Sequence, residues 1–207
     1  LTTAPVSVAA ACGIDAMVHA LEAYISTAAS PFSDAMAEKA LELIGANIRR
    51  YTANSGDIEA AENMLVGSLF AGIAFSWARL GDVHAMSHPV SAFFNVPHGV
   101  ANAILLPTIV EYNALADHGK YFNIYNYIAK LPAAPEEFTP DMLVDAIVEL
   151  NDSLGIPDGL EEVGVTKDKF DAMADDAMKS GNIAVNPRST TKKDVLALYE
   201  KAFSGLE

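Results

Sequence analysis

Apolar residues recur at spacings of three and four along most of the chain, which is the period of an amphipathic α-helix. Alternating runs of β-branched residues, which would predict strands, do not occur in the sequence. Judged by helix start and stop signals, the pattern predicts an all-α domain of roughly eight or nine helices. The predicted helices cover residues 8–26, 33–51, 57 to before 81, 83–94, 98 or 99 onward with a kink at Pro107, 121–130, 139–154, 166–179 and 190–203.

Residues that favour helix ends set several of these boundaries. Ser7 and Ser33 are expected to cap the first two helices, because a serine oxygen can accept a hydrogen bond from a free N–H group of the first turn. Asn95–Pro97 is expected to separate two helices, because proline cannot continue a helix from the preceding turn. Gly155 and Gly181 are the predicted stops of two later helices.

Composition narrows the classes of protein to which the chain can belong. Its 207 residues suit one domain, and 51% of them are hydrophobic, enough for a substantial core. The formal net charge of -14 would repel a phosphate backbone, so no nucleic-acid partner is expected. No membrane span is expected either, because no run of 18 or more apolar residues occurs. The single cysteine, Cys12, is expected to be a small buried residue, and its isolation favours a reducing, cytoplasmic location.

The candidate chemistry lies in four of the five histidines and one aspartate. His84, His88 and His98 fall within fifteen residues, and Asp15 lies four residues before His19. Residues four apart project from the same face of a helix, so the carboxylate and the imidazole could reach one cation. Imidazole suits zinc, iron, copper and nickel, and an added carboxylate favours harder ions such as ferrous iron or zinc.

Each of these residues also has a simpler interpretation. An aspartate and a histidine four apart on a helix form a metal site in only ~10% of cases, because short motifs match often by chance. His84 and His88 could be core histidines bonded to carbonyl groups, and His98 could cap the next helix. Their coexistence favours a metal site, as do the apolar neighbours of Asp15 and His19, because a buried charge needs a partner.

At this point the sequence shows a resemblance to a known family. The segment GIDAMVHALEAY (13–24) resembles the first metal-binding signature of the iron-containing (group III) alcohol dehydrogenases, and GDVHAMSHPVSAFFNVPHGVANAILLP (81–107) resembles the second. Asn186-Pro187-Arg188 and the last helix are similar to the C-terminal end of the family. Its members include lactaldehyde reductases, propanediol dehydrogenases and butanol dehydrogenases.

The resemblance implies a role for each candidate residue. Asp15, His19, His84 and His98 match the four metal ligands, and His88 matches an active-site histidine near the metal. The implied metal is Fe2+, with Zn2+ as the alternative, and the implied cofactor is NAD or NADP. The implied partners are a small alcohol and the corresponding aldehyde, and a homo-oligomer remains open.

The resemblance also implies how the chain is organised. Residues 1–207 are expected to be the helical, metal-binding catalytic domain of the dehydroquinate synthase-like fold. The N-terminal nucleotide-binding domain is expected to be absent from the chain, because no strand followed by a Gly-rich loop occurs in it. Cofactor-binding residues therefore stay unassigned, and this chain is expected to be inactive by itself.

Two alternatives compete with a dehydrogenase that oxidises short primary alcohols or diols. One is a non-catalytic domain in which the metal is structural, and the other is a zinc-dependent polyol dehydrogenase. A structural site is coordinatively closed, whereas a catalytic site keeps a position for substrate or water. The presence of all four ligand residues favours the iron-dependent enzyme over the polyol dehydrogenase.

Overall fold

A computed structural model describes residues 3–206 of the chain, and within this range it forms nine α-helices and no strand. The predicted all-α fold and the predicted number of helices are therefore confirmed. The helices are α1 (Val6–Ile25), α2 (Pro31–Ala53), α3 (Ile58–Ala78), α4 (Asp82–Phe94), α5 (His98–Asn113), α6 (Lys120–Ile128), α7 (Pro140–Leu154), α8 (Phe170–Ala177) and α9 (Lys192–Phe203).

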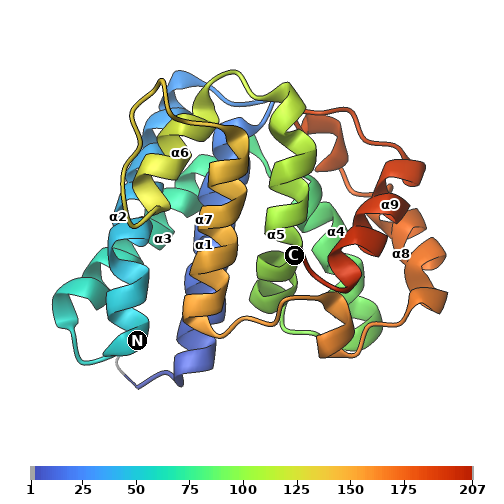
Figure 1. The fold of residues 1–207 in the computed structure, drawn as a ribbon, viewed down its shortest axis with the longest axis horizontal. Coiled ribbons are helices and arrows are strands. Elements are labelled where there is room, and N and C mark those ends of the chain that lie inside the picture. Colours follow the sequence, from blue (N-terminus) through green and yellow to red (C-terminus); the bar gives the residue numbers. More distant parts are fainter. Residues whose placement is uncertain (1–2, 207) are drawn as a thin grey trace.

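Helix α1 lies at the centre of the fold and packs against α2, α3 and α5 (Figure 1). Its residues Ile14, Met17 and Leu21 are fully buried. A helix that is apolar on most of its faces needs neighbours on most of its faces, and α1 has them. On the other side of α5, helices α4, α8 and α9 complete the molecule.

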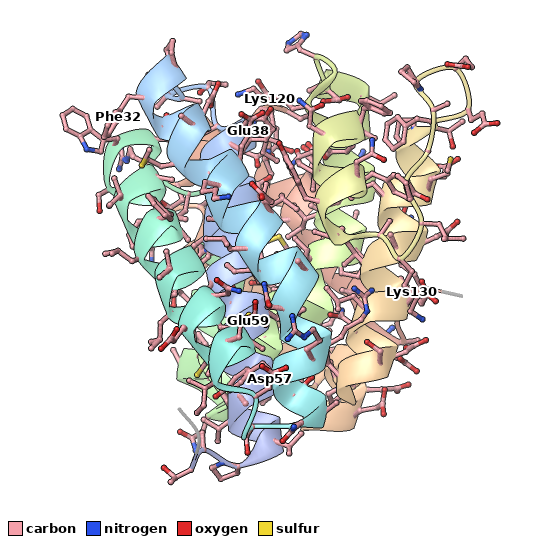
Figure 2. The ribbon with its side chains drawn as sticks, turned by 90° about the vertical axis from the view of Figure 1, so that its left-hand side faces the viewer. Phe32, Glu38, Asp57, Glu59, Lys120 and Lys130 are labelled. Atoms are coloured by element: carbon pink, nitrogen blue, oxygen red, sulfur yellow. The ribbon has the colours of Figure 1, made fainter. Side chains whose placement is uncertain are left out.

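Within residues 3–206, two helices are long and apolar enough to cross a membrane, judged by length and composition alone. In α1, 67% of the apolar window is buried inside the protein, as expected for a core helix. In α3 only 33% is buried, and Leu65, Leu69 and Trp77 are exposed on it. Figure 2 looks onto α2 and α3, which run side by side, with Phe32 at one end of the pair and Asp57 and Glu59 at the other.

Several helix boundaries differ from the predicted ones. Helix α1 begins at Val6 after Pro5, without the side-chain cap expected from Ser7. The cap of α2 is Ser30 rather than Ser33, and the two serines form a reciprocal capping box. The prediction failed here because both serines precede the same apolar pattern, and Pro31 extends the helix by one turn. Helix α8 ends at Ala177, before the predicted stop at Gly181.

Other boundary predictions are confirmed, and two of them position the candidate residues. Asp57 caps α3 by accepting a hydrogen bond from the N–H group of Ala60. Asn95 takes the left-handed conformation, with a φ of 56°, and ends α4. Helix α5 then starts at His98, so the break at Asn95–Pro97 returns the chain to the side of α4 that carries the other histidines.

Candidate metal centre

Three helices bring Asp15, His19, His84 and His98 together. Asp15 and His19 lie one turn apart on α1, His84 lies in the first turn of α4, and His98 is the first residue of α5. One donor atom from each of the four side chains can be chosen so that all lie within 4.8 Å of one another. The spacing within α1 alone could produce only half of this cluster, and the packing of α5 against α1 and of α4 against α5 supplies the rest.

The distances within the cluster are those of side chains that face one another. Asp15 Oδ1 lies 3.6 Å from His98 Nε2 and 3.9 Å from His84 Nε2, while Asp15 Oδ2 lies 3.9 Å from His19 Nδ1. One carboxylate oxygen and three imidazole nitrogens form a donor set that fits Fe2+ or Zn2+. The residues present therefore fit the metal that the resemblance implies.

The close approach of α5 to α1 depends on the absence of a side chain at Gly99. A Cβ atom there would lie 2.3 Å from the carbonyl oxygen of Ala11. Any other residue at this position would push the start of α5, and with it His98, away from Asp15. The glycine after the histidine is thus a structural requirement of the cluster.

Burial favours the neutral form of two histidines of the cluster. It lowers the pKa of His19 to about 4, although the carboxylate of Asp15 acts in the opposite direction. It also lowers the pKa of His98 below its ordinary value of 6.5, again against the effect of Asp15. A neutral imidazole is the form that binds a metal, so these two side chains are suited to accept a cation at neutral pH.

His88 lies beside the cluster and outside the set of four donor atoms. Its ring centre is 5.3 Å from that of His98 and 6.0 Å from that of His84, and the side chain is exposed. Desolvation, with a smaller contribution from His84 and His98, lowers its pKa. An exposed, neutral imidazole at this distance can accept a proton from a molecule bound at the cluster. A ring from a further helix also contacts the cluster: Phe75, on α3, stacks on the imidazole of His19, with 4.7 Å between ring centres.

Two buried polar residues that the sequence did not single out contact the ligand set. Glu22 Oε2 lies 2.5 Å from Nδ1 of His84. Asn102 Nδ2 lies 2.6 Å from Asp15 Oδ1, 3.1 Å from His98 Nε2 and 3.2 Å from His84 Nε2. Helical spacing could have indicated both, because Glu22 follows His19 by three residues and Asn102 follows His98 by four.

Cys12 differs from its prediction, because it is exposed rather than buried. It lies three residues before Asp15 on α1 and does not belong to the cluster of donor atoms. The apolar residues around it in the sequence suggested burial, but its own side of α1 is the side that the neighbouring helices leave uncovered.

Comparison with known proteins agrees with this fold. A family model described as "Fe-containing alcohol dehydrogenase family, C-terminal" matches residues 9–203. The chain therefore belongs to the iron-containing alcohol dehydrogenase family and corresponds to its C-terminal part.

Particular relatives agree with the family model. The chain is 40% identical over 200 residues to a 1,3-propanediol dehydrogenase of Citrobacter freundii, covering 96% of this chain and 52% of the relative. It is 41% identical, with the same coverage, to a lactaldehyde reductase of Escherichia coli (strain K12). The crystal structure of a 1,3-propanediol oxidoreductase superposes with a TM-score of 0.93 at 38% identity, covering 98% of this chain and 53% of that one. The chain thus spans about half the length of these relatives.

Proposed function

We propose that the chain is the metal-binding part of an NAD(P)-dependent alcohol dehydrogenase that oxidises short primary alcohols or diols and reduces the corresponding aldehydes. The observation that carries this proposal is the convergence of Asp15, His19, His84 and His98 in a chain of this family. Relatives named for propanediol and lactaldehyde support a small hydroxylated substrate.

A divalent cation held by these four residues supplies Lewis-acid polarisation of an alcohol or aldehyde oxygen. Oxidation of the alcohol would remove a hydride from the carbon, which a bound nicotinamide cofactor would take up, and a proton from the hydroxyl group. The proton needs an acceptor near the donor cluster. His88 fits this role, because it is exposed, has a lowered pKa and lies beside His98.

We place the nicotinamide site outside residues 1–207. The described part of the chain contains no strand, and so no Gly-rich loop that follows one. One relative is named an NADPH-dependent butanol dehydrogenase, and the structure of another family member, a sulfoacetaldehyde reductase, was determined with NAD+. These names support a nicotinamide cofactor without selecting NAD or NADP.

The exposure of the cluster favours a catalytic over a structural metal. The side chain of His84 is 1% exposed, but those of Asp15, His19 and His98 are 23%, 21% and 37% exposed. A structural site is enclosed by its ligands, whereas this cluster is reachable by a small molecule from solvent. Counting the nitrogen and oxygen ligands of the bound ion by X-ray absorption tests this, because a closed four-coordinate shell would favour the structural alternative.

Metal titration tests the site directly. We expect anaerobic titration of the 207-residue chain with Fe2+ or Zn2+ to show one bound equivalent, because one cluster of four donors is present in the described residues. His84→Ala should abolish this binding, since the remaining donors leave the ion incompletely coordinated. His118→Ala, which changes a histidine outside the cluster, should bind like the wild type. Unchanged stoichiometry in His84→Ala would contradict the proposed site.

A further inference from the structure

Glu22 is a buried carboxylate that contacts the candidate metal centre without belonging to the donor set. It lies on α1 and is 2% exposed. Oε2 lies 2.5 Å from Nδ1 of His84, and Oε1 accepts a hydrogen bond of 2.7 Å from the N–H group of Val83. Both oxygens are therefore engaged with the first turn of α4. Burying a carboxylate costs free energy unless it is compensated, so this position calls for an explanation.

The hydrogen bonds around His84 define which ring nitrogen carries the proton. The side chain of Asn102 presents one of its two polar atoms to Asp15 Oδ1 at 2.6 Å. That atom must be the amide nitrogen, because two oxygens at this distance would repel. The same nitrogen lies 3.1 Å from His98 Nε2 and 3.2 Å from His84 Nε2, so its two hydrogens face three acceptors and do not fix the tautomer of His84. The contact with Glu22 fixes it: Oε2 lies 2.5 Å from Nδ1, and because a carboxylate oxygen can only accept, Nδ1 carries the proton and donates it to Glu22.

This arrangement leaves the lone pair of Nε2 facing the other ligands. His84 Nε2 lies 3.9 Å from Asp15 Oδ1, on the opposite edge of the ring from Glu22. The three imidazoles of the donor set are neutral ligands, so Asp15 supplies the only negative charge among the four. Glu22 supplies a second negative charge one imidazole away, and two negative charges balance a divalent cation.

We propose that Glu22 is a positioning residue of the metal centre: it fixes the tautomer and the orientation of His84 and completes the charge balance of a bound divalent cation. The inference rests on the proposed metal site. It assigns Glu22 a role in metal affinity that goes beyond holding α4 in place.

A purely structural role for Glu22 is the rival explanation, and the local packing shows what it would be. Helix α4 has no side-chain cap of its own, and Glu22 accepts the N–H group of Val83 in its first turn. Gly81 leaves room for this contact, because a Cβ atom there would lie 3.0 Å from Glu22 Oε1. A test must therefore remove the charge of Glu22 and keep an acceptor for the Val83 N–H group.

Glu22→Gln meets this requirement, because glutamine has the same shape and retains one carbonyl oxygen. Titrating the 207-residue chain with Zn2+ against a competing chelator should give an affinity roughly 10–100-fold weaker than that of the wild type, with one equivalent still bound. Glu62→Gln removes the same charge from an exposed position on α3 and should leave the affinity unchanged. A Zn2+ affinity of Glu22→Gln equal to that of the wild type would overturn the inference.

A second measurement needs no substitution and holds even if Glu22→Gln fails to fold. In the Zn2+-bound wild-type chain, 15N NMR of the histidine rings should show His84 with a protonated Nδ1. A protonated Nε2 on His84 would overturn the inference. A wild-type chain that binds no Zn2+ would contradict the metal site and the role of Glu22 together. Normal binding with an unaffected Glu22→Gln removes only the role of Glu22.

Discussion

At the scale of single residues, burial acts in opposite directions on the pKa of His19 and on that of Asp82. It lowers the pKa of His19 to about 4, which favours the neutral ring that can bind a metal. It raises the pKa of the Asp82 carboxyl group, in the first turn of α4, to about 7, and the hydrogen bond that Thr190 donates to Oδ2 opposes this rise only in part. Asp82 Oδ1 has no hydrogen-bond partner, which adds to the cost of its negative charge.

Asp82 therefore makes the stability of the metal-free chain depend on pH. A carboxyl group whose pKa rises from 3.8 to about 7 on folding favours the folded state below pH ~4. This contribution is lost as the pH rises through about 7. Asp82→Asn removes this titrating group. Between pH 4 and 8 the free energy of unfolding of the variant should therefore fall by on the order of 3 kcal/mol less than that of the wild type.

Denaturant unfolding of the metal-free chain at several pH values measures this difference. Asp145→Asn, an exposed substitution on α7, serves as the control and should follow the pH dependence of the wild type. Parallel pH profiles for Asp82→Asn and the wild type would show that the folded protein tolerates the charge of Asp82 without cost.

At the scale of helices, the metal centre depends on how closely α5 approaches α1. Gly99→Ala places a Cβ atom 2.3 Å from the carbonyl oxygen of Ala11, and backbone cannot rotate away as a side chain can. We expect this substitution to destabilise the chain by about 1–3 kcal/mol, the usual cost of overpacking. It should also weaken Zn2+ binding, because His98 precedes Gly99 directly.

Gly72→Ala is the matched control for this prediction. Gly72 lies inside α3, and a Cβ atom there would meet no other atom within 4 Å. Alanine restricts the unfolded chain more than glycine does, so this variant should gain about 0.4–1 kcal/mol. Thermal or denaturant unfolding measures the stability of both variants. A Gly99→Ala variant as stable as the wild type would contradict the close approach of α1 and α5.

The helices could be predicted from the sequence because the apolar period and the end signals are local. Asp57 and Asn95 illustrate this, since each ends or starts a helix through its own side chain or backbone. The predicted cap at Ser33 was wrong because Ser30, which can also cap the helix, lies within one turn of it. Single-residue cap positions are the least certain part of such a prediction.

The candidate site could be predicted only in part, for a physical reason. Asp15 and His19 share a helix face, so their proximity follows from the sequence. The contacts of Glu22 with His84 and of Asn102 with Asp15 cross between helices, at separations of 62 and 87 residues. Helical spacing places Glu22 near His19 and Asn102 near His98, but no local period encodes the contacts of Glu22 and Asn102 with residues of other helices.

At the scale of the whole molecule, the chain holds the four candidate metal ligands in a helical framework and spans about half the length of the relatives it matches. The proposed hydride transfer would require an alcohol and a nicotinamide ring to be held together in the geometry of reaction. Such positioning can account for ~7–11 kcal/mol of a barrier. A chain that bound only the metal and the alcohol would lack this contribution.

We therefore expect the 207-residue chain loaded with Fe2+ to show negligible NAD(P)-dependent oxidation of short primary alcohols or diols. Activity should appear when residues 1–207 are joined to the N-terminal nucleotide-binding domain that the family resemblance implies, as measured by NADH or NADPH formation. His98→Ala in the joined protein should abolish the activity, because one metal ligand is lost, whereas His118→Ala should retain it. Robust turnover by the 207 residues alone would contradict the placement of the nicotinamide site outside them. Inactivity of the joined, Fe2+-loaded protein towards all short alcohols and diols would contradict the dehydrogenase function itself.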